Sequence, residues 1–176
     1  MEYAYFISDA KIKSRIENSI EYILALYAEV HNSSKKNYRE ETYRVIILYC
    51  VSVIEALLLV IYSKLDEEIY KTDYKETSTL SKGFAHTKHS DSPIVVAVKK
   101  DVPKEEKEIG LHELVVFLRK NNILKKNTAE RIAAINDRRN TFHLHKKGST
   151  ACTVQDVEEA LDLINVVLRG TYGMVK

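Results

Sequence analysis

VIILYCVSVIEALLLVIY, residues Val45–Tyr62, is the apolar run around which this chain is expected to fold. It is almost as long as a transmembrane helix, which takes about 20 residues. Glu55 lies near its middle, where a charge costs about 2.5–3.5 kcal/mol even on the scale derived from insertion into membranes. Arg44 and Lys64 flank the run and prevent a longer span. The sequence therefore predicts a buried central helix and no membrane partner.

The composition outside this run also favours helices. The chain has 176 residues, the size of one domain. It contains 5 Gly and 2 Pro, whereas strand-rich folds and phosphate-binding loops usually need more of both. Two cysteines are too few for a disulfide scaffold or a four-cysteine zinc site. With no secretory leader expected at the N-terminus, we predict a cytoplasmic protein.

Apolar residues recur at helical spacing on both sides of the central run. The expected helices cover residues 8–31, 38–70 and 111–121, a segment capped by Asn127 and Thr128, and a last helix from Thr153 to Gly170. Residues 71–110 are polar and contain both prolines. Within them, Ile94–Val98 reads as a strand that pairs near Thr77–Lys82. The predicted fold is all-α: an up-and-down bundle of four to five helices with a small β-hairpin insertion at 71–110, in a single domain of residues 1–176.

The net charge of +2 hides an uneven distribution. Between Arg119 and Lys147 there are nine Lys or Arg and only two acidic residues. The following segment, residues 148–163, carries four acidic residues and no basic one. A basic patch of this kind is able to hold phosphate groups, although many charge runs are simply solvated helix faces.

Residues 130–145, ERIAAINDRRNTFHLH, carry the most informative pattern within the basic block. On a continuous helix, Arg139 and His143 would fall about 20° from the inward apolar stripe. Arg138 and His145 would fall on the outward side. An Arg and a His on a buried or groove-facing stripe each need a partner, because an unpaired buried polar group costs a few kcal/mol.

Two interpretations of this pattern follow from residue chemistry. In the first, His143 moves a proton at neutral pH, Arg139 grips phosphate oxygens, and Asn140 positions the phosphate or fixes the histidine tautomer. That site would act on a phosphodiester and would need no metal. In the second, the residues form a satisfied polar cluster in which Arg139 pairs with Glu55.

The run Arg138-Arg139-Asn140-Thr141-Phe142-His143-Leu144-His145 resembles the signature of the HEPN superfamily. That signature is an Arg, usually followed by a polar residue, and then a His after four to six intervening residues. The resemblance implies a helical bundle, and many members are metal-independent ribonucleases, including toxins of toxin–antitoxin modules and effectors of phage defence. It also implies a homodimer in which two motifs meet, and an acidic residue in an earlier helix that contacts the motif Arg, a role that Glu55 suits. The 71–110 insertion departs from the family pattern.

The spacing leaves the motif pair open. Arg138 and His143 have four residues between them, and Arg139 and His145 have five, so both pairs fit the family range. Arg139 and His143 have three, which is too few, although helical phase favours them. A helix that ends or bends near Thr141 would remove this conflict.

The function predicted from the sequence is that of a metal-independent endoribonuclease of HEPN type, with RNA as substrate, a homodimeric state, an antitoxin protein as a further partner and no cofactor. The candidate catalytic residues are Glu55, Arg138, Arg139, Asn140, His143 and His145, and the candidate RNA-binding residues are Lys125, Lys126, Lys146 and Lys147. The alternative is a non-catalytic helical module for RNA binding, protein interaction or dimerisation. A third, weaker hypothesis is a metal protein that uses His86, His89, His112 or His143.

Overall fold

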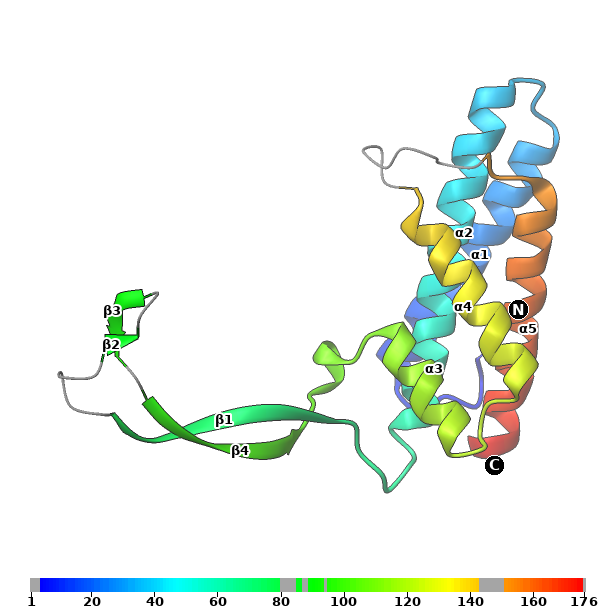
Figure 1. Ribbon diagram of the computed structural model, residues 1–176. Helices are drawn as coiled ribbons and strands as arrows, with labels where there is room; N and C mark the ends of the chain where they lie inside the picture. Colours follow the sequence, from blue (N-terminus) through cyan, green and yellow to red (C-terminus); the bar gives the residue numbers. More distant parts are fainter. Residues whose placement is uncertain (1–3, 80–84, 87–88, 94, 143–150, 176) are drawn as a thin grey trace. The chain divides into compact units, whose positions relative to one another are not determined.

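The computed structural model describes residues 4–79, 85–86, 89–93, 95–142 and 151–175 (Figure 1). The chain forms two compact units. One combines Met1–Leu65 with Gly110–Lys176 and is helical, and the other is Asp66–Ile109 and is built from strands. The predicted fold class is confirmed: the protein is mostly helical with a small β-hairpin insertion between the second and third helices.

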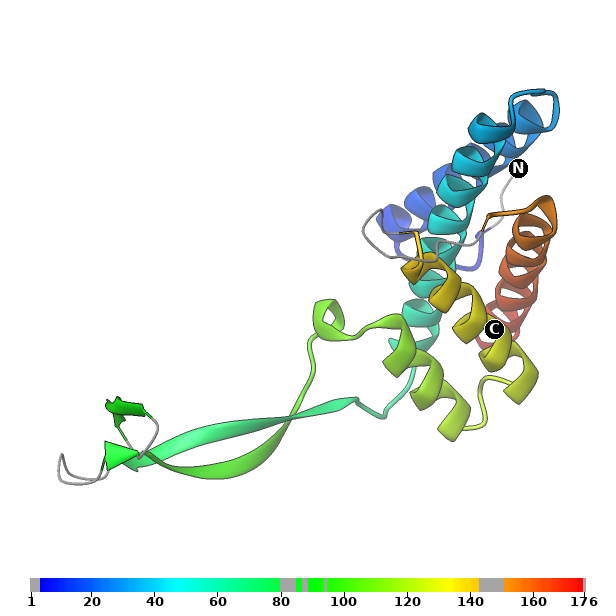
Figure 2. The same ribbon diagram turned by 45° about the horizontal axis from the view of Figure 1, so that its top comes forward.

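The helical unit contains all five helices of the described chain. They are α1 (Ala10–His31), α2 (Lys36–Tyr62), α3 (Leu111–Lys120), α4 (Lys126–Asn140) and α5 (Val154–Val175). α2 contacts each of the other four (Figures 1 and 2). The core is therefore organised around the apolar run that the sequence singled out.

α2 is a core helix of the bundle. By length and composition it is the one helix of the described chain that could cross a membrane, yet 61% of its most apolar window is buried within the fold. It ends at Tyr62, and not near Tyr70 as the sequence predicted. Ser63 forms its C-cap, and the strand that follows begins at Tyr70.

The ends of α4 and α5 differ in part from the prediction. α5 begins as expected, because Asp156 Oδ2 accepts hydrogen bonds from Thr153 N and Thr153 Oγ1 at 2.7 and 2.6 Å. α4 begins two to three residues earlier than predicted, with Lys125 at its N-cap. α5 also continues past Gly170 to Val175.

Tertiary packing explains why Gly170 does not end α5. A glycine inside a helix costs about 1 kcal/mol relative to alanine, which packing is able to offset. The next residue, Thr171, is fully buried and its Oγ1 donates to Val167 O at 2.8 Å. Tyr172 then packs against the rings of Tyr5 and Phe6, with centroids 5.6 and 5.9 Å apart. These contacts hold the last turns in place.

The second unit is a long two-stranded ribbon. β1 (Tyr70–Thr79) pairs antiparallel with β4 (Val95–Pro103), with a bulge between Glu76 and Ser78. At its far end β2 (Ala85–His86) pairs with β3 (His89–Pro93), and η1 (Glu106–Glu108) follows β4. The predicted strand at 94–98 is confirmed over residues 95–98, and Ile94 lies outside the described residues. Both strands of the hairpin are longer than expected, because the pairing starts at Tyr70 rather than near Thr77.

Candidate functional site

α4 ends inside the predicted motif. Its last residue is Asn140, and Thr141 is the C-cap, whose N–H donates to Arg138 O at 2.9 Å. Phe142 N–H donates to Arg139 O at 3.1 Å. The helical phase extrapolated to His143 therefore does not apply, because no α-helix continues past Asn140 in the described residues.

Several predicted site residues come directly after this helix end. His143, His145, Lys146 and Lys147 lie outside the residues that the structure describes. The described part of the motif consists of the two arginines, Asn140, Thr141 and Phe142. These residues have clearly different surroundings.

Arg138 is bonded to the start of α5. Its Nη2 donates to Asp156 Oδ2 at 2.6 Å and to Ala151 O at 2.7 Å. The side chains of Arg138 and Asp156 are only 27% and 20% exposed. The prediction that Arg138 points outward was therefore wrong: its side of α4 faces α5. The ion pair joins the two helix ends that flank residues 143–150.

Arg131 repeats this arrangement two turns earlier on α4. Its Nη2 lies 2.8 Å from Asp162 Oδ2 and its Nε lies 3.4 Å from Glu159 Oε1. The hydrogen bond to Asp162 is the main reason why the pKa of Arg131 is raised. Two arginines of the basic block are thus neutralised by the acidic helix that follows it in the sequence.

Arg139 has a different environment from Arg138. It is half-buried, and its side chain makes no hydrogen bond or ion pair with any residue that the structure describes. It lines a cavity of about 650 Å³ between α1, α2 and the end of α4. The residues around this cavity are Arg15, Ser19, Leu48, Tyr49, Ser52, Arg139, Asn140 and Phe142.

The chemistry of this cavity suits an anion. It has two guanidinium groups, an amide and two serine hydroxyls, and none of the described residues around it is a carboxylate. Guanidinium and amide groups donate hydrogen bonds to phosphate oxygens, and arginine does so in a bidentate way.

Aromatic side chains complete the cavity wall. Tyr49 is 39% exposed and packs edge-to-face against Tyr22, with ring centroids 4.9 Å apart. Phe142 lies under the guanidinium of Arg44, whose Cζ is 6.0 Å from the ring centroid. Arg44 also bonds Glu41 at 2.7 Å. The cavity therefore combines cationic and aromatic groups.

Glu55 lies on α2, about one turn after Ser52, and is not among the residues that line the cavity. It is half-buried, and its helical phase is within about 20° of Leu48, so it shares the face of α2 that reaches the cavity. In the described part of the chain, no hydrogen bond or ion pair joins Glu55 to Arg139.

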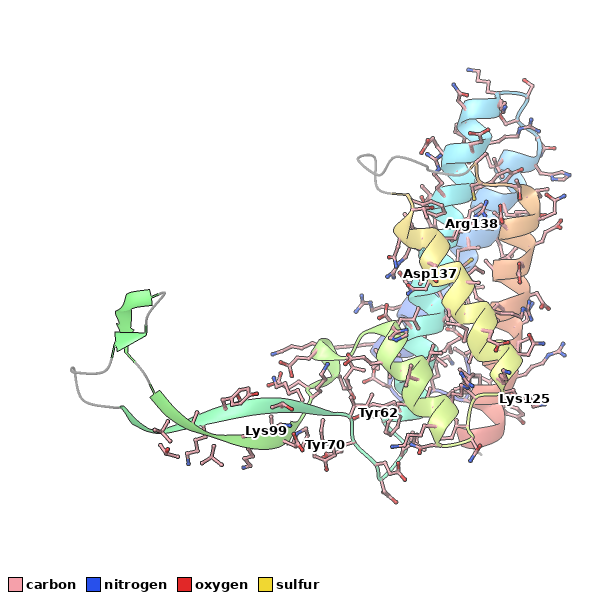
Figure 3. The ribbon with its side chains drawn as sticks, viewed as in Figure 1. Tyr62, Tyr70, Lys99, Lys125, Asp137 and Arg138 are labelled. Atoms are coloured by element: carbon pink, nitrogen blue, oxygen red, sulfur yellow. The ribbon has the colours of Figure 1, made fainter. Side chains whose placement is uncertain are left out.

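Lys125 and Lys126 lie at the other end of α4. Thirteen residues separate Lys125 from Arg138, which is about 20 Å along a helix. Figure 3 shows Lys125 and Arg138 near opposite ends of α4. Lys126 Nζ is 3.8 Å from Glu130 Oε1. The structure does not bring these two lysines to the cavity.

Sequence reasoning missed the side of the cavity that α1 and α2 provide. Arg15 and Ser19 are one turn apart on the polar side of α1, and Tyr49 belongs to the apolar run of α2. Nothing in their spacing distinguishes them from an ordinary solvated surface. Only the fold, which brings residues of α1, α2 and the end of α4 around one cavity, makes them part of one site.

The structure gives no support to a metal centre in the part of the chain it describes. No group of three or more His, Cys, Asp or Glu side chains there is placed to hold an ion. His112 lines a separate cavity of about 430 Å³ between α3 and α4. The thiols of Cys50 and Cys152 are buried, and burial is the main cause that raises their pKa values to about 12 and about 11.

Comparison with protein-family models, curated proteins and solved structures found no match to this chain. The basis for a functional conclusion is therefore the cavity and the helix ends around it.

Proposed function

We propose that this chain is a metal-independent endoribonuclease of the HEPN type, and that the cavity at the end of α4 binds an RNA phosphodiester. One observation carries the proposal. The side chain of Arg139 bonds to none of the described residues, and it lines a cavity with Arg15 that has no carboxylate among its described walls. A half-buried arginine without a counter-ion favours an anionic ligand.

The proposed reaction is a transesterification within RNA. The ribose 2′-hydroxyl attacks the adjacent phosphorus, a new P–O2′ bond forms, and the P–O5′ bond breaks. One group takes the proton of the 2′-hydroxyl and another delivers a proton to the leaving 5′ oxygen. The products are a 2′,3′-cyclic phosphate end and a 5′-hydroxyl end, and no metal or cofactor takes part.

The residues of this chain divide these tasks. Arg139 stabilises the negative charge that builds up on the phosphate, and Asn140 orients it. His143 or His145, which follow Phe142 in the sequence, act as general acid or base. The exposed ring of Tyr49 and the ring of Phe142 offer surfaces on which an unstacked base would pack.

Lysines outside the cavity extend the proposed RNA contact. Lys146 and Lys147 follow the motif directly and would hold the backbone close to the cleaved bond. Lys125 and Lys126 lie about 20 Å away along α4, so only a longer RNA would reach them. The proposal also includes a homodimer and an antitoxin protein as the partner of a toxin, both of which come from the family resemblance, and a cytoplasmic location, which is expected from the sequence.

The alternative function is a non-catalytic helical module for RNA or protein binding. The observation that favours it is the Arg138 ion pair, because half of the two-arginine motif serves to join α4 to α5. In that case the motif would be kept for folding rather than for catalysis.

RNA cleavage in excess EDTA tests the proposal. Purified wild-type protein is incubated with mixed RNA beside Arg139→Ala, His143→Ala and His145→Ala. Arg119→Ala serves as the control, because Arg119 is an exposed arginine at the other cavity. We expect the wild type and the control to cleave, and Arg139→Ala and one histidine variant to lose cleavage while their circular dichroism is unchanged. Binding without cleavage in the wild type would support the alternative, and activity that EDTA abolishes would contradict both.

A further inference from the structure

We propose that the ribbon of the second unit is an interface between two copies of this chain, in which β1 pairs antiparallel with β1 of the second copy. The inference concerns residues 70–79 and uses none of the proposed catalytic residues, and it places the contact between two copies in the ribbon rather than at two meeting motifs.

The outer edge of β1 is open. In the described part of the chain, β4 is the one strand that pairs with β1, in a sheet of two strands. A two-stranded ribbon is at best marginally stable in water, and an open edge is a template for another strand. Three large side chains of the ribbon are exposed: Tyr70 is 56%, Tyr74 67% and Val98 57% exposed. Tyr70 and Lys99 are labelled on the ribbon in Figure 3.

The sequence of β1 is complementary to itself about Tyr74. In an antiparallel pair of identical strands related by a two-fold axis at Tyr74, each Asp73 lies opposite Lys75 of the second copy. Directly opposed residues on one face of a pair attract when their charges are opposite. Both side chains are exposed and therefore accessible to such a partner.

Pairing of β4 with β4 of a second copy about such an axis is unfavourable. A two-fold axis at Lys99 or at Lys100 would place that lysine opposite its own copy, which is unfavourable. β1 has a further feature that favours pairing, since Tyr74 N–H donates to the side chain of Asp73 at 2.8 Å. A second strand would supply a backbone carbonyl for this donor and leave the Asp73 carboxylate for Lys75. The interface therefore forms a four-stranded sheet with the order β4-β1-β1-β4.

A pair of charge variants tests this register. Lys75→Asp places a carboxylate opposite Asp73 of the second copy, and the two-fold axis repeats this repulsion in every homodimer. The second variant, Asp73→Lys with Lys100→Asp, places lysine opposite lysine between copies, and it keeps opposite charges within the ribbon because residues 73 and 100 are directly paired. Mixing the two variants restores both attractive contacts. Lys99→Asp is the control, because it makes the same change of charge on β4 opposite Tyr74.

The measurement is sedimentation equilibrium of the full chain, with circular dichroism to confirm folding. We expect the wild type and Lys99→Asp to dimerise alike, each charge variant alone to dimerise about tenfold more weakly, and their mixture to form heterodimers with wild-type affinity. A monomeric wild type would overturn the proposal. Homodimers of Lys75→Asp as tight as the wild type, or variants that fail to associate when mixed, would overturn it as well.

Discussion

Arginines of the same basic block lie on two faces of α4, and the two faces differ in whether carboxylates surround the arginine. On the face toward α5, Arg131 and Arg138 each bond to carboxylates. At the end of the helix, Arg139 faces a cavity whose described walls contain no carboxylate. The difference shows that adjacent arginines can have unrelated roles, because one residue turns a helix by about 100°. Local charge in the sequence therefore does not identify which arginine is available to a ligand.

The largest expected effect is the loss of activity on changing Arg139. If Arg139 stabilises the phosphate in the transition state, Arg139→Ala should lower kcat for RNA cleavage by about 10²–10³-fold, the usual cost of losing one such donor. Its unfolding free energy should stay near that of the wild type, because the side chain bonds none of the described residues. Single-turnover kinetics and urea denaturation measure the two quantities. An Arg139→Ala variant that unfolds easily would break the contrast with Arg138.

A second prediction concerns Cys152, which lies beside the Arg138 ion pair. Burial, followed by the charge of Asp156, raises the pKa of Cys152 to about 11. At pH 8 the thiolate fraction should then be about 100-fold lower than for a thiol with the ordinary pKa near 9. Alkylation by iodoacetamide should be slow, and it should speed up about tenfold per pH unit until the pH approaches that pKa.

The comparison with Arg139 makes this prediction sharper. Arg138→Ala should slow alkylation of Cys152, because the charge and the hydrogen bond of Arg138 lower the pKa of this thiol, while Arg139→Ala should leave the rate unchanged. Peptide mass spectrometry distinguishes Cys152 from Cys50. Equal rates for Cys152 in the folded protein and in a peptide would show that the α4–α5 contact opens readily.

These two residues also show how far the sequence could lead. The apolar run 45–62 predicted the central helix, and Thr153 with Asp156 predicted the start of α5, because both signals are local. The pairing of Arg138 with Asp156 was not predictable, since it depends on how α5 packs against α4. The phase argument placed Arg138 outward because it located only the apolar stripe and not the neighbouring helix.

The candidate site was predicted only in part for the same reason. Arg139 and Asn140 were chosen from the motif, and they do line a cavity. Arg15, Ser19 and Tyr49 come from segments that are distant in the sequence, and helical periodicity alone assigns them to solvent or to the core. The end of α2 was misplaced because the residues after Tyr62 are compatible with a helix until the strand pairing of β1 is known.

The third prediction concerns Arg138, for which we expect a loss of stability where Arg139 is expected to show a loss of activity. Arg138→Ala should lower the unfolding free energy by about 2 kcal/mol, because it removes hydrogen bonds between a partly buried guanidinium and the Asp156 carboxylate and Ala151 carbonyl. Asp156→Ala should cost at least as much, since it also removes the two bonds to Thr153. Urea denaturation at neutral pH measures both changes. If Arg138→Ala had wild-type stability and no cleavage, Arg138 would be the catalytic arginine and the assignment of the two residues would be exchanged.

The smallest expected effect separates Arg131 from Arg138 on the same face. Arg131 has two carboxylate partners, but Glu159 and Asp162 are 55% and 62% exposed, so water screens both pairs. Exposed ion pairs contribute about 0.2–1 kcal/mol, and Arg131→Gln should therefore change the unfolding free energy by less than Arg138→Ala does.

Raising the salt concentration should reduce the loss of unfolding free energy in Arg131→Gln, because exposed pairs are screened within about 10 Å at 0.1 M salt. Urea denaturation at low and high salt measures it, and Lys126→Gln, at a more exposed pair, should cost no more than Arg131→Gln. A loss for Arg131→Gln equal to that of Arg138→Ala would mean that the whole α4–α5 face, and not its motif end alone, holds the two helices together.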